Sequence, residues 1–267
     1  MSATVIYIGN EKGGVGKTTT VLNVGEALAR AGAKVLLVDM DNAGHLSHTL
    51  TKSRPELRTN AAVTTDHIIE MRPEVPRKPA AEAIIEAVRP GVDLIAAPTN
   101  DAYLTSAEKY ITDDPIDGPF VLREALQPIR DRYDYILLDC SPTRNALEMA
   151  ALVASDQLIV VNEPIEFSVL AMQKMTAFAQ KIKKRQNAGL WVRGTILNRL
   201  SAGTQLAKKW TAKFDEAGIP VLGMVRTAEV IKKAVEDGVS LADVKDGWRN
   251  TIDYDDIASA ITQRKKS

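Results

Sequence analysis

Two lysines and three glycines between residues 12 and 17 have the types and spacing that best predict chemistry. The run Lys12–Thr19 reads Lys-Gly-Gly-Val-Gly-Lys-Thr-Thr and follows an apolar run, Thr4–Gly9. Glycines let consecutive backbone N–H groups turn toward phosphate oxygens, and Lys17 adds a positive charge. The segment Thr18–Arg30 has apolar residues at helical spacing, so bound phosphates would lie at a helix N-terminus. We therefore predict a nucleotide-phosphate loop made of Gly13, Gly14, Val15, Gly16, Lys17, Thr18 and Thr19.

The loop departs from the strict phosphate-loop pattern. Glu11 stands where that pattern has a glycine, and a second lysine, Lys12, precedes the paired glycines. In this deviant form one lysine serves its own site and the other can reach elsewhere. Thr18, the first residue of the expected helix, is placed to bind Mg²⁺. The alternative is a glycine-rich turn with solvated lysines, which the strand and helix flanks disfavour.

Three aspartates follow apolar runs. Asp39 and Asp41 are two residues apart, so on an extended segment their side chains point to the same side. Asp139 ends the apolar run Tyr135–Asp139, a common way to hold Mg²⁺ through water. A lone aspartate at a strand end is more often a cap or turn residue. Three such carboxylates downstream of a phosphate loop favour the metal and phosphate interpretation.

Composition excludes several classes of protein. The chain has 267 residues, 45% of them hydrophobic, and its 34 Lys and Arg balance 34 Asp and Glu. A balanced charge means that any nucleic-acid or membrane binding must come from local patches. Cys140 is the only cysteine, so an intrachain disulfide is excluded. With no apolar stretch of about 20 residues and no secretory signal pattern, we expect a soluble, cytoplasmic protein.

Short apolar runs recur at intervals long enough for an intervening helix. Their hydrophobicity is continuous rather than alternating, which is typical of parallel strands covered on both faces. We predict an α/β fold with a doubly wound, mostly parallel sheet of about seven or eight strands flanked by helices. Ligands then bind beyond the carboxyl ends of the strands. The predicted strands are Thr4–Gly9, Lys34–Asp39, Asp93–Pro98, Tyr135–Asp139, Gln157–Asn162, Trp191–Asn198 and Pro220–Val225.

Residues 1–267 are interpreted as a single domain. The interval Thr51–Pro90 contains five prolines, which break any long helix, and we interpret it as an irregular surface excursion. The phosphate loop begins so close to residue 1 that we expect no N-terminal helix-turn-helix domain.

Taken together, these residues resemble the ParA/Soj partition ATPases, P-loop NTPases within the wider MinD/ParA group. The resemblance covers nearly the whole chain. Its markers occur in order: Lys12–Thr19, Val35–Asp41, Asp134–Pro142, Val160–Pro164, Val225-Arg226 and Ala234–Gly238.

The resemblance implies a role for each phosphate-loop residue. Lys17 would bind the β- and γ-phosphates of ATP in its own subunit, and Lys12 would cross a dimer interface to the partner's nucleotide. Thr18 would ligate Mg²⁺, with Asp39 and Asp139 in its outer shell. Hydrolysis would then depend on dimerisation.

Two further roles follow from the resemblance, and one segment departs from it. Asp41 would position or activate the attacking water, and Asn198 would contact the adenine, although an Asn at a strand end is a turn residue about as often. The family usually reads Pro-Gln-Gly-Asn after this aspartate, whereas this chain has Asn42-Ala43-Gly44-His45, and Glu11 stands where Gln is common. His45 and His48 also invite a metal interpretation, but a polar loop is favoured.

Basic clusters are the candidate DNA contacts. The resemblance implies nonspecific DNA binding by ATP-bound dimers through basic residues in the C-terminal half, whereas the default for such runs is a solvated helix face. The tail Thr251–Ile261 has one narrow apolar stripe and three acids, so we predict a packing helix rather than the membrane helix of MinD relatives. The clusters are Lys181, Lys183, Lys184 and Arg185; Lys208 and Lys209 with Lys213; Lys232 and Lys233; and Arg264, Lys265 and Lys266.

The function implied is that of a nucleoid-associated ATPase that uses ATP and Mg²⁺. It would form a homodimer on ATP, bind DNA nonspecifically, and be stimulated by a ParB-like adaptor protein to segregate plasmid or chromosome DNA. One alternative is a ParA-like ATPase that positions a protein cargo. Another is an ATP-dependent biosynthetic ligase on the same scaffold.

Overall fold

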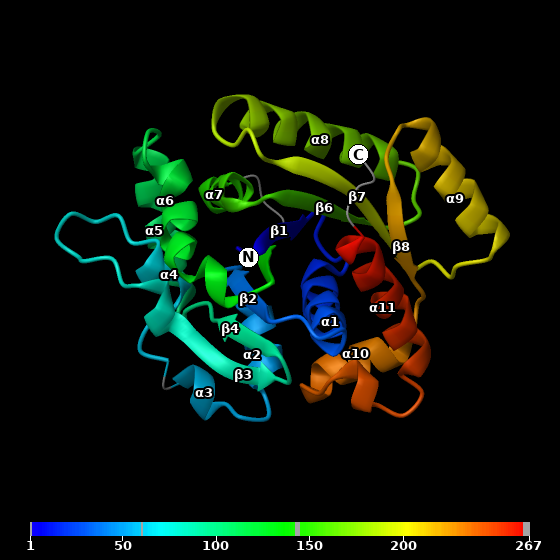
Figure 1. The fold of residues 1–267 in the computed structure, drawn as a ribbon, viewed down its shortest axis with the longest axis horizontal. Coiled ribbons are helices and arrows are strands. Elements are labelled where there is room, and N and C mark those ends of the chain that lie inside the picture. The colour runs from blue at the N-terminus through cyan, green and yellow to red at the C-terminus, as the bar shows by residue number, and fades with distance from the viewer. Residues whose placement is uncertain (1, 60, 142–144, 264–267) are drawn as a thin grey trace.

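Eight strands form one sheet in the computed structural model, which describes residues 2–59, 61–141 and 145–263 (Figure 1). Their order is β3-β4-β2-β5-β1-β6-β7-β8, and every neighbouring pair is parallel except β3 with β4. The predicted α/β fold with a mostly parallel sheet is therefore confirmed. The strands are β1 (Thr4–Gly9), β2 (Val35–Met40), β3 (Ile84–Arg89), β4 (Val92–Ile95), β5 (Tyr135–Cys140), β6 (Gln157–Asn162), β7 (Trp191–Asn198) and β8 (Val221–Val225).

Helices cover both faces of the sheet, as Figure 1 shows for α1 and α11 on one side and α7 and α8 on the other. The first face carries α1 (Lys17–Arg30), α2 (His45–Thr51), α10 (Glu229–Asp237) and α11 (Trp248–Thr262). The second carries α4 (Thr65–Ile68), α5 (Asp101–Asp113), α6 (Val121–Leu126), α7 (Ala146–Ala154), α8 (Ser168–Arg185) and α9 (Gln205–Glu216). A short helix, α3 (Glu56–Thr59), and four 3₁₀ turns (Ala80–Ala83, Gly118–Phe120, Gln127–Arg132 and Leu241–Asp243) complete the described elements.

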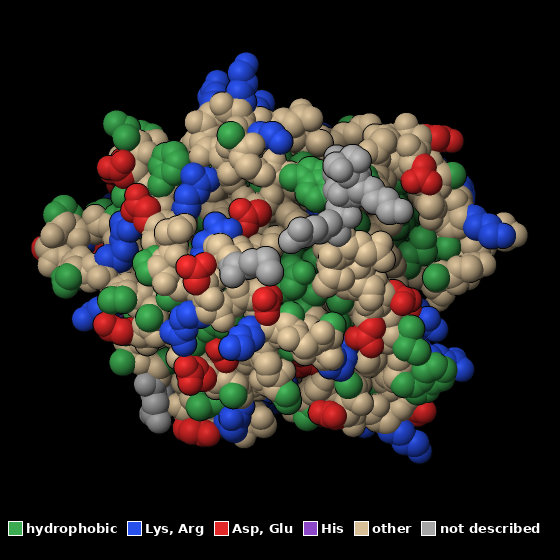
Figure 2. Space-filling model, in the orientation of Figure 1, with side chains coloured by type: hydrophobic (Ala, Val, Ile, Leu, Met, Phe, Trp, Pro, Cys, Tyr) green, Lys and Arg blue, Asp and Glu red, His purple; other side chains and the backbone are tan. Residues whose placement is uncertain are grey.

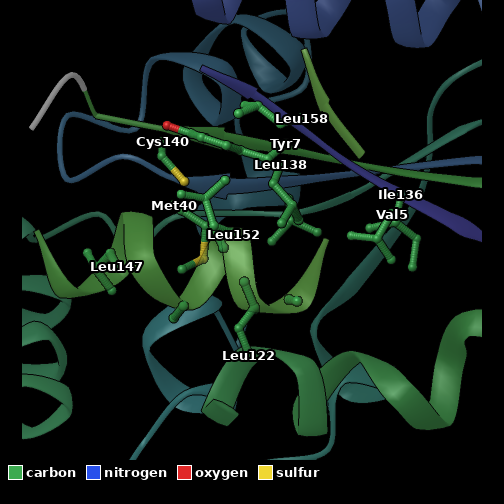
Figure 3. Close-up of a cluster of buried hydrophobic side chains, with 14 of the residues drawn as sticks. Val5, Tyr7, Met40, Leu122, Ile136, Leu138, Cys140, Leu147, Leu152 and Leu158 are labelled. Carbon is green, nitrogen blue, oxygen red and sulfur yellow. The ribbon is translucent and has the colours of Figure 1, made fainter. Parts of the chain in front are cut away.

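Strand β2 illustrates why the sheet is sandwiched. All six of its residues are buried. Leu36 and Val38 belong to the core under α6 and α7, whereas Leu37 belongs to the core under α1. Figure 3 shows the first of these cores, with Leu147 and Leu152 of α7 facing the strands. Continuous apolar sequence thus follows from burial on both faces.

The interval Thr51–Pro90 is more regular than predicted. It contains β3, α3 and α4, and Ile68 and Ile69 are fully buried in the core. Strand β3 lies at the sheet edge, pairs only with β4, and exposes two residues in its middle. Its sequence therefore lacks the apolar run that marks the other strands. The interpretation of this interval as an irregular surface excursion does not hold for β3 and α4, whereas no residue of α3 is buried.

The last helix packs on the body of the protein, as predicted. Tyr254, Ile257 and Ile261 of α11 are buried in the core that α1 also lines. Across the described part of the chain, no helix combines the length and apolarity needed to span a membrane.

Candidate nucleotide-phosphate site

The carboxyl ends of three adjacent strands bring the predicted loop and carboxylates together. Strand β5 lies between β1 and β2, and its register pairs Asp139 with both Ile8 and Asp39. The phosphate loop follows β1 directly, so it lies at the same edge as the two aspartates. Residues far apart in the sequence therefore form one candidate site.

The glycines give the loop its shape. Gly14 and Gly16 have positive φ values of 74° and 88°, a region that favours glycine. Helix α1 begins at Lys17 with Gly16 as its N-cap, and no described side chain caps its first turn. The free N–H groups of this turn, with the helix dipole behind them, form an anion site.

Lys17 is buried, with only 7% of its surface exposed. Its Nζ donates a hydrogen bond to the Lys12 carbonyl oxygen at 3.2 Å. Burial lowers the pKa of Lys17, while the carboxylates of Asp139 and Asp41 oppose this shift. The ammonium group is thus a desolvated positive charge facing the site, suited to a phosphate.

Asp139 is a carboxylate near the end of β5. It is fully buried, and neither side-chain oxygen has a hydrogen bond of good geometry among the described residues. Burial, and then the neighbouring Asp39 carboxylate, raise the pKa of Asp139, while the nearby Thr18 hydroxyl and Lys17 ammonium groups oppose the rise. A buried carboxylate left this way is costly unless a cation approaches it. The Thr18 hydroxyl and Asp139 therefore fit Mg²⁺.

Asp39 lies beside Asp139, but both of its carboxylate oxygens accept hydrogen bonds from residues of the segment that follows β2. Its Oδ2 accepts from the Ser47 backbone N–H at 2.8 Å and hydroxyl at 2.6 Å, and its Oδ1 accepts from the Asp41 N–H at 3.1 Å. Burial raises the pKa of Asp39, and these hydrogen bonds oppose the rise. Asp39 thus fixes the turn between β2 and α2, and its outer-shell role toward the metal stays a prediction.

Asp41 and the departing segment line a cavity beside the loop. The cavity measures about 800 Å³ and is lined by Lys17, Thr18, Asp41, His45 and His48, among others. Asp41 Oδ1 accepts from the Ala43 N–H at 3.0 Å. Within the described ranges, no cluster of three or more His, Cys, Asp or Glu residues could hold a metal. A cavity lined by Lys17, Thr18 and Asp41 suits Mg²⁺ that arrives with phosphates, because this ion is usually bound through phosphates, water and one or two side chains.

Asn198 holds the phosphate loop. Its Nδ2 donates to the Val15 carbonyl at 2.8 Å, and its Oδ1 accepts from the Arg199 N–H at 3.1 Å. A Cβ on Gly16 would lie 2.3 Å from Nδ2, so a side chain there would displace the amide. Asn198 also lines a second cavity of about 410 Å³ next to the loop. Its contact with adenine stays a prediction.

Several side chains that border this second cavity were not predicted as site residues, among them Arg226, Ile231 and Tyr254. Arg226 donates through Nε and Nη2 to both carboxylate oxygens of Asp253, at 2.8 and 2.7 Å, which anchors the segment after β8. Tyr254 and Ile231 supply apolar walls. Arg226 was noticed only as a family marker, because its partner in α11 is 27 residues away.

Lys12 lies on the outer side of the loop. Half of its side chain is exposed (51%), and its Nζ lies 2.9 Å from Glu163 Oε2. Arg199 approaches the other oxygen, with Nη1 2.5 Å from Oε1, and its Nη2 donates to the Gly14 carbonyl at 3.2 Å. Glu163 and Arg199 were not predicted as site residues.

The predicted DNA contacts do not form one patch in the monomer. The end of α8 exposes four basic side chains, those of Lys181, Lys183, Lys184 and Arg185. This end of α8 lies near the amino ends of the strands, away from the phosphate loop. Asn187, just beyond the helix, shows this placement because its side chain donates to the carbonyl of Ser155, which precedes β6. Lys208 and Lys209 are exposed near the start of α9, and Lys232 and Lys233 are exposed on α10.

Charges of both signs are mixed over the face in Figure 2, although basic side chains project beside α8 at the top. Pro142 and the cluster Arg264, Lys265 and Lys266 lie outside the described residues.

Comparisons of sequence find related proteins. A family model described as an AAA domain matches residues 3–192. The chromosome partitioning protein ParA of Caulobacter vibrioides is 34% identical over 221 residues, covering 79% of this chain and 77% of the relative. The chromosome-partitioning ATPase Soj of Treponema pallidum is 30% identical over 215 residues, covering 78% and 76%. An uncharacterized Mycobacterium tuberculosis protein, Rv1708, is 34% identical over 214 residues, and the chain spans only 64% of its length.

Solved structures share the fold at lower identity. A variant of Cyanothece McdA in complex with ATP has a TM-score of 0.81 at 23% identity, covering 100% of this chain and 99% of that one. A putative plasmid partition protein of Borrelia burgdorferi bound to AMPPNP has 0.77 at 22%, covering 97% and 98%. Cobyrinic acid a,c-diamide synthase of Mycobacterium smegmatis, with an ATP analog and magnesium, has 0.78 at 22%, covering 99% and 96%.

Proposed function

The chain belongs to the ParA/Soj family of P-loop ATPases, and from this premise we propose that it is a cytoplasmic, nucleoid-associated partition ATPase. It dimerises on ATP, binds DNA without sequence preference and hydrolyses ATP to ADP and phosphate. A ParB-like adaptor protein stimulates hydrolysis, and the cargo is plasmid or chromosome DNA.

The observation that carries this proposal is that the two lysines of one loop differ in burial and position. Lys17 is buried and faces the candidate phosphate site, whereas half of the Lys12 side chain is exposed on the outside of the loop. A site that needed only its own subunit would not require the outer lysine. The arrangement supports a site that two subunits complete.

The residues fit ATP and Mg²⁺. Phosphoryl transfer needs charge neutralisation and an oriented nucleophile more than covalent help, and Mg²⁺ supplies neutralisation when bound. The first-turn N–H groups and Lys17 would hold the phosphates, and Thr18 would ligate the metal with Asp139 in its outer shell. Asp41, which lines the same cavity as Lys17, orients the attacking water.

The name of the Caulobacter relative and the separated basic clusters support the DNA step. Affinity for DNA depends steeply on the number of phosphates neutralised, with a log–log salt slope of about −0.9 per contact. A monomer of balanced charge, with its basic residues spread over α8, α9 and α10, binds weakly. Dimerisation doubles the contacts and turns DNA binding on.

The test is salt-dependent retention on DNA with ATP, with ADP and without nucleotide, read beside the dimer fraction from sedimentation. We expect retention and dimers only with ATP. Lys17→Ala should lose nucleotide binding, and Lys12→Ala should bind nucleotide but form fewer dimers. Asp41→Ala should keep ATP bound in a long-lived dimer. Equal DNA binding in all three nucleotide conditions would contradict the proposal.

Two other functions use the same fold. A protein cargo in place of DNA keeps the same ATPase cycle, and the adaptor that stimulates hydrolysis decides between the two cargoes. A biosynthetic ligase is the third, since a diamide synthase shares the fold. A ligase would turn over ATP with its small substrate alone, so an ATPase rate that depends on DNA and adaptor argues against it.

A further inference from the structure

We propose that Glu163 is a positioning residue that holds Lys12 on its own subunit and releases it when a second subunit binds. This inference rests on the proposed function, in which Lys12 acts across a dimer interface. It adds a competing contact within the monomer, so that dimerisation must first break the pair between Lys12 and Glu163.

The Glu163 carboxylate is fixed in place. Glu163 directly follows β6 and is only 8% exposed. Its carbonyl oxygen accepts from the Ser168 hydroxyl at 2.5 Å and from the Ile165 N–H at 2.8 Å. These bonds tie the backbone of Glu163 to the start of α8, and its buried side chain lies between Lys12 and Arg199 beside the phosphate loop.

The backbone of Lys12 is fixed as well, and only its side chain has freedom. The Lys12 N–H donates to Asn10 Oδ1 at 2.9 Å. The Asn10 amide in turn donates to the Val161 carbonyl at 2.6 Å and to Asn162 Oδ1 at 3.0 Å. The Lys12 side chain can therefore swing between Glu163 and solvent without any change in the loop.

Arg199 makes the release of Lys12 possible. A buried carboxylate that loses its only cation is strongly destabilising. Here the Arg199 guanidinium group lies 2.5 Å from the second oxygen of Glu163, while Lys12 occupies the first. When Lys12 leaves, Arg199 still compensates the charge of Glu163. The ion pair between Lys12 and Glu163 can therefore hold the lysine in the monomer and still break when a second subunit binds.

The expected effect follows from the exposure of Lys12. An ion pair with one half-exposed partner changes an equilibrium by about a factor of three. Each dimer releases two lysines, so the dimer dissociation constant should change by about tenfold. Glu163→Gln should therefore dimerise about tenfold more tightly than the unsubstituted chain at a saturating concentration of a nonhydrolysable ATP analogue.

The experiment compares three variants by sedimentation velocity. Glu166→Gln is the matched control, because it removes the same charge from an exposed residue of the same loop. Glu163→Asp keeps the charge and should lie closer to the unsubstituted chain than Glu163→Gln does. A Glu163→Gln dimer of unchanged or lower stability would overturn the proposal.

A second measurement detects the ion pair between Lys12 and Glu163 in the absence of nucleotide. The lysines are labelled by reductive ¹³C-methylation, and Lys12→Arg identifies the Lys12 resonance in the NMR spectrum. This resonance should shift in Glu163→Gln and stay in place in Glu166→Gln. If it does not shift, the pair is absent and the inference fails. If the unsubstituted chain does not dimerise with the analogue, the proposed function fails, and the spectrum still decides whether Glu163 holds Lys12.

Discussion

Asp39 and Asp139 are neighbours in register on adjacent strands, both fully buried, and yet their surroundings are opposite. Asp39 accepts three hydrogen bonds from Ser47 and Asp41. Neither oxygen of Asp139 has such a bond within the described ranges. Burial raises the pKa of each. The hydrogen bonds from Ser47 and Asp41 oppose the rise for Asp39, whereas the Thr18 hydroxyl and Lys17 ammonium groups oppose it for Asp139.

The difference separates a structural carboxylate from an open one. Asp39 is satisfied by the protein and contributes to the stability of the turn that leads into α2. Among the described residues the Asp139 oxygens lack hydrogen bonds of good geometry, so a cation that approaches them stabilises the loaded protein relative to the empty one. Each prediction below tests one side of this contrast.

The largest effect should follow from Asp139→Asn. Loss of an outer-shell partner of a bound metal typically lowers affinity by about 10–100-fold, and we expect this loss for ATP in the presence of Mg²⁺. Without Mg²⁺ the affinity should change little. Calorimetric titration measures both values, and Asp39→Asn serves as the neighbouring control. Equal losses for the two variants would break the contrast.

Asp39→Asn should instead destabilise the fold. The amide offers one acceptor oxygen in place of two, and its NH₂ group faces donors, so we expect a loss of about 2–4 kcal/mol in the free energy of unfolding. Asp139→Asn should leave this free energy unchanged or higher, because it removes a buried charge whose ionised form burial disfavours. Urea unfolding of the nucleotide-free proteins provides the measurement, and a more destabilised Asp139→Asn would refute the assignment.

Ser47→Ala should have a smaller effect. The Ser47 hydroxyl donates to Asp39 and accepts from the Ala97 N–H at 2.9 Å. Its removal should lower the free energy of unfolding by about 1–2 kcal/mol. In the Asp39→Asn background the same substitution should matter less, since the Ser47 hydroxyl donates its hydrogen bond to the carboxylate that this background lacks. Additive effects in urea unfolding would show that they act separately.

The smallest effect concerns pH. The raised pKa of Asp139 means that the folded state binds its proton more tightly than the unfolded state does. Its stabilising contribution is present below the ordinary aspartate pKa and is lost as pH rises through the folded value. Thermal unfolding from about pH 4 to about pH 7 should therefore show a growing advantage of Asp139→Asn over the unsubstituted chain. A constant difference would contradict this.

The sequence predicted the parts of the fold that burial encodes. The bounds of β1, β6 and β7 agree with the predicted runs, because a strand covered on both faces is apolar throughout. The edge strand β3 was missed, since one partner and partial exposure leave no continuous apolar run.

The sequence also placed the loop and the aspartates at one edge, but not their contacts. The distinction between Asp39 and Asp139 depends on Ser47, whose hydroxyl is positioned by the start of α2. The pair between Lys12 and Glu163 joins residues 151 positions apart, and no local pattern encodes it. Such contacts can be predicted only when the order of the strands in the sheet is known.

Helix α8 connects the two ends of the molecule mechanically. It starts at Ser168, which is bonded to Glu163 next to Lys12, and its 18 residues end in Lys183, Lys184 and Arg185 at the opposite edge. A helix of this length is about 27 Å long. If the helix moves as a rigid body, a tilt of about 5° about its first residue, Ser168, displaces its last residue, Arg185, by about 2 Å. A subunit contact near Lys12 can thus move the basic residues at the far end of α8 without any change in the sheet.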